Sequence, residues 1–130
     1  VRKNRTTHKR RKERKMDKNG KIWGFTSKLF AKNNVEVHRI VGRKGGKSSL
    51  HRHTAKWSMF FVERGQIKIH IEKNDYPLMD ETILAYGQTI VIKPNEYHSF
   101  EILTNGTVAY EIYWTELDPN DIERKNCGTI

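Results

Sequence analysis

The stretch Gly45–Gly65, GGKSSLHRHTAKWSMFFVERG, carries the pattern that decides the fold. His51 and His53 are two residues apart, so both imidazoles leave the same face of an extended strand. A polar turn follows, and then the apolar run Trp57–Val62 leads to Gly65. We therefore expect a small β domain that presents two histidines together.

A second stretch, Gly87–Phe100 (GQTIVIKPNEYHSF), places a third histidine, His98, at the end of another apolar strand. Three histidines on strands of one small β domain are the usual composition of a metal site. Imidazole ligands suit Zn, Fe, Mn or Ni, and the pattern does not choose among them. The sequence predicts one divalent transition metal bound by His51, His53 and His98.

The rest of the chain has the pattern of an all-β protein. Apolar residues alternate in period two over Val35–Val41 and over Gln66–Glu72. Further short strands are expected at Ser48–His53, Trp57–Val62, Thr82–Tyr86, Thr89–Lys93, His98–Leu103 and Val108–Trp114. Many short strands separated by turn residues indicate a sandwich or barrel. Asp118–Arg124 alone has helical character, with Asp118 as the N-cap, so a short C-terminal helical turn is predicted.

The positive charge of the chain is concentrated near its beginning. The formal net charge is +10, and residues 1–21 hold eleven Lys/Arg against two acids, so residues 22–130 are nearly neutral. Residues 1–21 are almost devoid of apolar side chains, which predicts a basic, flexible, disordered tail before a single domain over 22–130. Such a tail could bind nucleic acid through counterion release. It lacks aromatic residues for base stacking, and Met16 resembles a natural start, so we favour a functionally silent tail.

Cysteine content and hydropathy suggest the compartment. Cys127 is the single cysteine, which excludes an internal disulfide and fits a reducing environment. No apolar run approaches the ~20 residues that a membrane-spanning helix needs. The basic N-terminal residues are not followed by the apolar segment of a secretory signal. We therefore expect a soluble, cytoplasmic protein.

From about Gly24 to Gly128 the chain resembles the cupins. Their first motif is a glycine, a short spacer, HxH, an acidic residue and a second glycine. It is matched in spacing by Gly45, His51, His53, position 58 and Gly65. Their second motif, G-x5-P-x-G-x2-H-x3-N, is matched by Gly87, Pro94 and His98, with one extra residue before the proline.

The departures from these motifs concern the ligand set. Ser58 stands where the acidic ligand is expected, Glu96 replaces the middle glycine and Ile102 replaces the asparagine. Strand alternation points the nearby acids Glu63 and Glu101 away from the histidines, so we expect water at the vacant position. The resemblance implies a double-stranded β-helix, or jelly-roll barrel, with the metal in its mouth, and a homodimer.

Within the cupins, three segments resemble the C-terminal domain of type II mannose-6-phosphate isomerases. They are residues 49–69, residues 87–102 and residues 110–128. In the last, Asp121, Ile122 and Arg124 match an acidic stretch that follows the final strand of that family. The resemblance implies a metal-dependent isomerase that acts on a sugar phosphate in carbohydrate or polysaccharide metabolism.

Such an isomerase needs a base beside the metal and groups that hold the substrate. The candidate catalytic bases are Glu111, Glu36 and His38. The candidate substrate-binding residues are Lys56 and Arg39 for a phosphate and Tyr97 for a sugar ring. Arg52 is placed lower because it lies between two inward histidines and points outward. Two alternatives remain open: a three-histidine non-haem iron dioxygenase, and a non-catalytic cupin that binds a small molecule.

Overall fold

The computed structural model describes residues 17–73, 78–116, 120–126 and 128. These residues form nine β-strands. Their bounds are β1 Asp17–Lys21, β2 Gly24–Lys32, β3 Val35–Gly42, β4 Trp57–Arg64, β5 Ile67–Glu72, β6 Met79–Leu84, β7 Thr89–Ile92, β8 Tyr97–Ile102 and β9 Thr107–Trp114.

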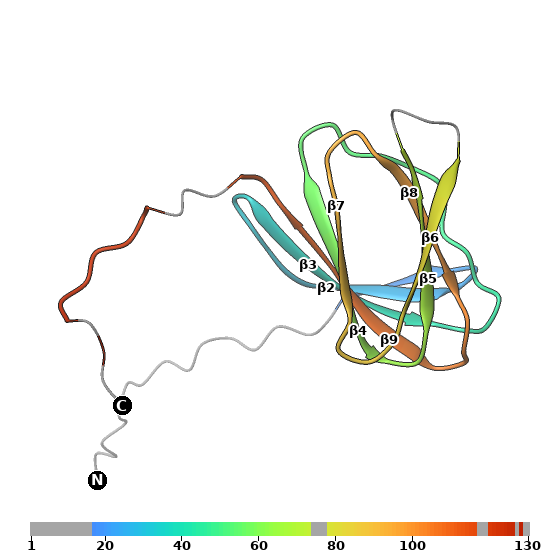
Figure 1. Ribbon diagram of the computed structural model, residues 1–130. Coiled ribbons are helices and arrows are strands. Elements are labelled where there is room, and N and C mark those ends of the chain that lie inside the picture. Colours follow the sequence, from blue (N-terminus) through green and yellow to red (C-terminus); the bar gives the residue numbers. More distant parts are fainter. Residues whose placement is uncertain (1–16, 74–77, 117–119, 127, 129–130) are drawn as a thin grey trace, which may run out of the picture.

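The strands form two antiparallel sheets around a common interior (Figure 1). The larger sheet has six strands in the order β1-β2-β3-β9-β4-β7, and the smaller has three in the order β6-β5-β8. β9 enters the larger sheet between β3 and β4, so the last strand of the chain pairs with two much earlier ones. This arrangement confirms the predicted all-β jelly-roll barrel.

The interior is filled by the inward residues of alternating strands. On β5, Ile67, Ile69 and Ile71 are buried, whereas the residues between them are only partly so. They face the larger sheet, where Phe60 and Val62 of β4 are fully buried. Burial of a large aliphatic or aromatic side chain contributes roughly 1.5–3 kcal/mol. The alternation seen in the sequence therefore builds one shared core.

Three predicted segments differ from the structure. Ser48–His53 is not a regular strand, because only Lys47 and His51 make isolated bridges, both to β8. Residues 17–21, assigned to the flexible tail, form β1 and pair with β2. Asn120–Asn126 contains no helix. The proposed N-cap Asp118, Cys127 and residues 1–16 lie outside the described residues.

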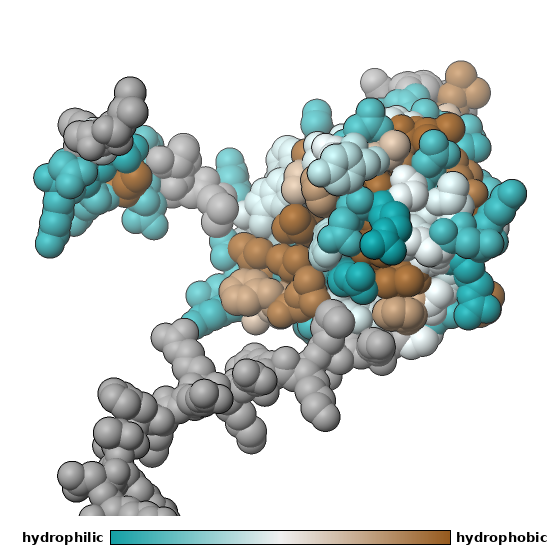
Figure 2. Space-filling view, turned by 90° about the horizontal axis from the view of Figure 1, so that it is seen from below, coloured by the Kyte–Doolittle hydropathy of each residue, from teal (hydrophilic) through white to brown (hydrophobic). Residues whose placement is uncertain are grey.

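Hydrophobic side chains also reach the surface. Figure 2 shows apolar groups lying among hydrophilic ones on one face of the molecule. Exposed large apolar side chains include those of Ile22, Phe30, Leu78, Ile83 and Val91. Within the described part of the chain, no helix has the length and apolar character required to cross a membrane.

Two rows of inward-facing residues cross the larger sheet at one end of the interior. In the first row, Glu111 of β9 lies between His38 of β3 and Phe60 of β4. In the second row, Tyr113 of β9 lies between Glu36 of β3 and Ser58 of β4. Most of these side chains are polar, unlike those of the core. The interior is therefore apolar over most of its depth and polar at this end.

The turn after β4 depends on a glycine. Gly65 has φ +82°, and a Cβ there would lie 2.4 Å from Thr107 Oγ1. Gly87 has a similar φ of +77°, but a Cβ there would meet nothing within 4 Å. Both substitutions to alanine carry the left-handed penalty of ~1–2 kcal/mol, and only Gly65→Ala adds a steric conflict.

We therefore expect Gly65→Ala to lower the free energy of unfolding by ~2–4 kcal/mol and Gly87→Ala by about 1 kcal/mol. Urea denaturation of the two variants and the parent protein measures the difference. Equal losses in the two variants would show that the contact with Thr107 has no energetic effect.

Candidate metal centre

A backbone bridge sets two of the predicted metal ligands side by side. His51 N–H donates to His98 C=O at 3.0 Å, and His98 N–H donates to His51 C=O at 2.8 Å. Their ring centroids are 4.7 Å apart. His53 joins them, with its ring centroid 5.3 Å from that of His51, and one ligand atom from each histidine lies within 4.8 Å of the others. The predicted cluster of three histidines is therefore present.

Hydrogen bonds to the ring nitrogens orient two of the imidazoles. His98 Nδ1 lies 3.0 Å from the Glu96 carbonyl oxygen, and His51 Nδ1 lies 3.1 Å from the Ser49 carbonyl oxygen. A ring nitrogen beside a carbonyl acts as the donor, so in each ring Nε2 carries the lone pair. Metal-binding histidines usually donate their other ring N–H to a carbonyl or carboxylate oxygen in this way.

The ligand atoms themselves are buried without partners. His98 is 2 % exposed, and no described group hydrogen-bonds to His98 Nε2 or His53 Nε2. Burial lowers the pKa of both imidazoles, and the neighbouring His51 lowers it further in each case. Neutral imidazoles are the form that binds metals. Three converging imidazoles, two of which have ring nitrogens without a partner among the described groups, fit a divalent transition metal.

The position of the family's acidic ligand is confirmed as an inward one. Ser58 is 1 % exposed and pairs across β4 and β9 with Tyr113, whose ring centroid lies 5.0 Å from that of His53. Glu63 and Glu101 point away, as expected. Glu63 accepts a hydrogen bond from Tyr110, and Glu101 lies 3.8 Å from His70. Among the described residues, no carboxylate joins the histidine cluster.

A cavity of about 490 Å³ opens beside the cluster at His51. Three of its lining residues, His38, Glu111 and Tyr113, come from the larger sheet. Other lining residues that were not predicted from the sequence include Trp23, Lys21, Lys47, Ser48 and Ser49. Lys47, Ser48 and Ser49 lie two to four residues before His51 in the first motif, so their proximity to the site could have been predicted from the sequence. Lys21, the last residue of β1, and Trp23, just before β2, are far from the motif in sequence and reach the cavity through the β1–β2 hairpin.

Glu111 is the carboxylate that faces this cavity. It is 8 % exposed, and its Oε2 has no hydrogen-bond partner among the described groups. Burial raises the pKa of Glu111 to about 7, and the hydrogen bond with Tyr113 acts in the opposite direction. Burial and the adjacent Glu111 raise the pKa of Tyr113, so this hydroxyl stays neutral and donates. Glu111 can therefore exist in either protonation state near neutral pH.

Glu36, His38 and Lys56 form a second polar group beside the first. His38 Nε2 lies 3.1 Å from Glu36 Oε2, and Lys56 Nζ lies 3.7 Å from Glu36 Oε1. The hydrogen bond from His38 lowers the pKa of Glu36, against burial, and the charge of Lys56 lowers it further. His38 lines the large cavity, whereas Glu36 and Lys56 line a separate cavity of about 60 Å³. Glu36, one of the three predicted catalytic bases, is therefore held as a carboxylate paired with His38 and Lys56.

Two predicted substrate-binding residues do not reach the cavity. Arg39 pairs across the sheet with Tyr110 on the outer face, because it alternates with the inward residues of β3. Tyr97 precedes the buried His98 and also points outward, where the guanidinium of Arg52 lies 4.8 Å from its ring centroid. The structure therefore places neither Arg39 nor Tyr97 at the cavity. The outward direction expected for Arg52 is confirmed.

The second motif requires a correction. Asn95 has φ +68°, a left-handed conformation that glycine and asparagine tolerate best. Counting back from His98, the motif's glycine also falls on Asn95 and not on Glu96. Asn95 therefore takes the glycine's conformational role. Glu96 is an additional buried carboxylate in the same turn.

Solved structures of other proteins share this fold. KdgF from Halomonas sp. matches with 12% identity over 78% of this chain and 89% of its own, at a TM-score of 0.67. CapF, the capsular polysaccharide assembling protein of Staphylococcus aureus, matches with 18% identity over 84% of this chain at a TM-score of 0.70. Oxalate decarboxylase of Bacillus subtilis matches with 12% identity over 77% of this chain at a TM-score of 0.69. The present chain spans only 31% of CapF and 27% of the decarboxylase.

No curated protein sequence matches the chain. The cupin domain family matches residues 39–115, which include all three clustered histidines and Glu111. This match covers more than half of the 130 residues. With the jelly-roll topology and the histidine cluster, it shows that the chain belongs to the cupin family.

Proposed function

We propose that this protein is a metal-dependent isomerase that interconverts an aldose phosphate and a ketose phosphate, as mannose-6-phosphate isomerases do. One observation carries the proposal: the buried carboxylate of Glu111 and the cluster histidine His51 line the same cavity. Aldose–ketose isomerisation moves a proton between adjacent carbons while the carbonyl is polarised. A base and a polarising centre beside one cavity meet that requirement.

The polarising centre would be held by His51, His53 and His98. A divalent metal bound there would act as a Lewis acid on the substrate carbonyl. Because all three ligands are neutral and Ser58 replaces the acidic one, the protein does not offset the charge of the ion. Such a centre favours an anionic substrate.

Glu111 is the residue that would move the proton. A general base works best when its pKa lies near the operating pH, and burial raises the pKa of Glu111 to about 7. Tyr113 donates a hydrogen bond to this carboxylate and so fixes its orientation. Glu36 is less suited, because its ion pairs with His38 and Lys56 favour the ionised form.

Cations and hydroxyls at the cavity would receive the phosphate. Lys21 and Lys47 line it together with Ser48 and Ser49. Ammonium and hydroxyl groups are suitable partners for phosphate oxygens. They take over the role predicted for Arg39. The likeness to CapF, named for capsular polysaccharide assembly, supports a substrate from carbohydrate metabolism.

A second candidate function is favoured by the ligand set. Three neutral histidines without a carboxylate also suit a non-haem iron site that uses oxygen. This dioxygenase would be active with iron and inactive with zinc.

A non-catalytic cupin that binds a small molecule is consistent with the missing acidic ligand. The homodimer, the cytoplasmic location and the closeness to mannose-6-phosphate isomerases stay predictions.

The metal site is tested by removing single ligands. We expect about one divalent ion per parent chain, and loss of it in His51→Ala and in His98→Ala, because two nitrogens cannot replace three. Elemental analysis of protein purified without chelators measures the content. His70→Ala is the control, since His70 lies on β5 and contacts Glu81 and Glu101 instead of the cluster. Substoichiometric metal in the parent protein would contradict both enzymatic functions.

The reaction is tested with mannose 6-phosphate. We expect the parent protein to produce the ketose phosphate and Glu111→Gln to lower kcat by ~10²–10⁴, with little effect on KM. Glu63→Gln, which alters an outer-face carboxylate, is the matched control and should keep full activity. Oxygen uptake in the iron-loaded protein, without isomerisation, would instead favour the dioxygenase. A metal-loaded protein that is inactive in both assays would be the binding cupin.

The raised pKa of Glu111 also predicts a pH-dependent stability. An unfolded glutamate releases its proton near its ordinary pKa of 4.5, whereas folded Glu111 keeps it up to a pKa of about 7. The folded state therefore binds more protons in this window, and its stability falls by ~1.4 kcal/mol per pH unit as pH rises through it.

Glu111→Gln removes this loss, so its stability relative to the parent should rise by ~3 kcal/mol between pH 4 and pH 8. Urea unfolding of the metal-free proteins at both pH values measures the change. A difference between variant and parent that does not depend on pH would contradict the raised pKa.

A further inference from the structure

We propose that Glu96 is a positioning residue for the metal-binding histidines, and that it acts by holding the turn of residues 93–96 against the smaller sheet. This inference rests on the proposed metal site and adds a residue to it. Glu96 is 7 % exposed and belongs neither to the histidine cluster nor to the cavity lining. A carboxylate buried to this degree is costly unless hydrogen bonds and charges stabilise it.

The Glu96 side chain closes the turn on itself. Lys93 N–H donates to Glu96 Oε1 at 3.0 Å, and Glu96 N–H donates to Lys93 C=O at 3.4 Å. Between them, Asn95 holds the left-handed conformation described above. A left-handed backbone conformation costs of order 1 kcal/mol or more for a residue with a side chain, so it persists only where the surrounding structure stabilises it. The carboxylate is the group that supplies those surroundings from within the turn.

The same turn contacts two of the three metal ligands. Asn95 N–H donates to His53 C=O at 2.7 Å, which fixes the backbone from which that imidazole projects. The Glu96 carbonyl oxygen accepts a hydrogen bond from His98 Nδ1 at 3.0 Å, which fixes the plane of the second imidazole. A displacement of the turn would therefore move both rings relative to His51.

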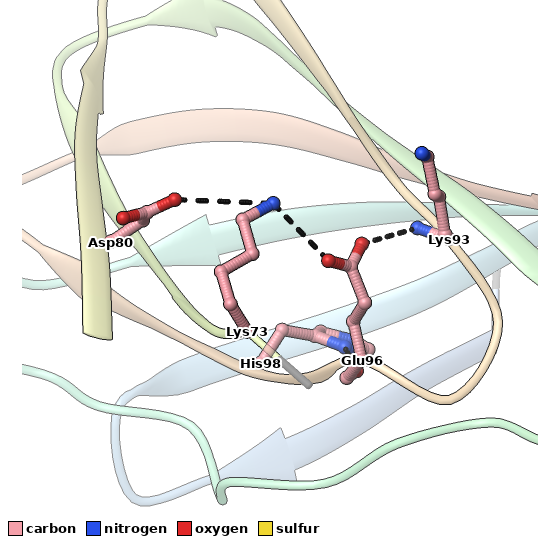
Figure 3. A network of polar contacts seen from close by, with 5 residues as sticks. All are labelled: Lys73, Asp80, Lys93, Glu96 and His98. Carbon is pink, nitrogen blue, oxygen red and sulfur yellow. Dashed lines mark hydrogen bonds and ion pairs between the residues drawn. The ribbon is translucent and has the colours of Figure 1, made fainter. Parts of the chain in front are cut away.

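The second oxygen of the carboxylate anchors the turn to the neighbouring strands of the smaller sheet (Figure 3). Lys73, directly after β5, donates from Nζ to Glu96 Oε2 at 3.1 Å. The same ammonium lies 3.9 Å from the carboxylate of Asp80 on β6. A charge-assisted hydrogen bond from a half-buried lysine is stronger than a neutral one. Glu96 thus joins the metal-binding turn to the two strands β5 and β6.

Metal affinity should be sensitive to this positioning, because the predicted ligand set consists of three histidines. No acidic ligand at position 58 compensates for a ring that moves, so affinity depends on the three imidazoles alone. Loss of outer-shell partners typically weakens metal binding by ~10–100-fold. Glu96 influences two of the three ligands, so its removal should fall within that range.

The test is a titration of the metal-free, full-length protein with Co²⁺, followed by its visible absorption. We expect Glu96→Ala to weaken Co²⁺ binding at least ~10-fold and to change the absorption spectrum, because the rings are no longer fixed. Glu96→Gln keeps an acceptor for Lys93 N–H but offers no charge to Lys73, so its loss should be smaller. The glutamine variant also provides a measurement if the alanine variant does not fold.

Thr107→Val is the matched control. Thr107 is 0 % exposed, and its hydroxyl closes another turn by donating to Thr104 C=O at 2.7 Å. We expect this variant to lose thermal stability while its Co²⁺ affinity and spectrum stay within twofold of the parent, a margin well below the ~10-fold effect of an outer-shell loss.

Unchanged affinity and spectrum in both Glu96 variants would overturn the inference alone, as would an equal loss of affinity in Thr107→Val. Absence of Co²⁺ binding by the parent protein would overturn the metal site and this inference together.

Discussion

The antiparallel bridge between His51 and His98 is the constraint on which the site depends. β8 is an edge of the smaller sheet, and the segment that precedes β4 runs along this open edge. Ser48 N–H donates to Phe100 C=O at 3.0 Å, and the two histidines exchange both of their backbone hydrogen bonds. An uncovered edge strand is prone to pair with other chains, so the segment protects β8 while it delivers His51 to His98. One set of backbone hydrogen bonds therefore both completes the barrel and assembles the ligands.

By itself, the resulting cluster of three histidines lowers the stability of the folded protein. Two buried imidazole nitrogens have no hydrogen-bond partner in the described part of the chain, and each unsatisfied polar group costs about 1–3 kcal/mol. Burial and mutual proximity also oppose protonation of His53 and His98, so the cluster cannot relieve the cost by becoming charged. The isoleucine-rich interior and the bridge to β8 hold the rings in place despite this. A preformed group of neutral nitrogens is what a metal requires, and its ligation would satisfy the orphaned atoms.

How far the sequence predicts this structure depends on the range of the interactions involved. The alternation of Ile67, Ile69 and Ile71 is local, so it predicted β5 correctly, and the local spacing of His51 and His53 predicted that their imidazoles lie together. β2 was missed because its pairing with β3 holds it, and its sequence does not alternate. The facing of Arg39 and Tyr97 depends on which side of a sheet meets the core, which no single segment determines. Lys21 reaches the cavity only because β1 and β2 form a hairpin, and the partner of Glu96, Lys73, lies 23 positions earlier in the chain.

Ser58 replaces the acidic ligand of the cupin motif, and the structure has a buried carboxylate close to that position. The carboxylate is missing from the ligand position, yet one is retained in the neighbouring row of the same sheet, at Glu111. A carboxylate bound directly to a metal would be held ionised, because the positive ion stabilises that form. Burial raises the pKa of Glu111 to about 7, so this carboxyl group can take up and release a proton. The departure at position 58 is therefore accompanied by a group suited to proton transfer beside the cavity, which is what a catalytic cupin needs and a purely binding one does not.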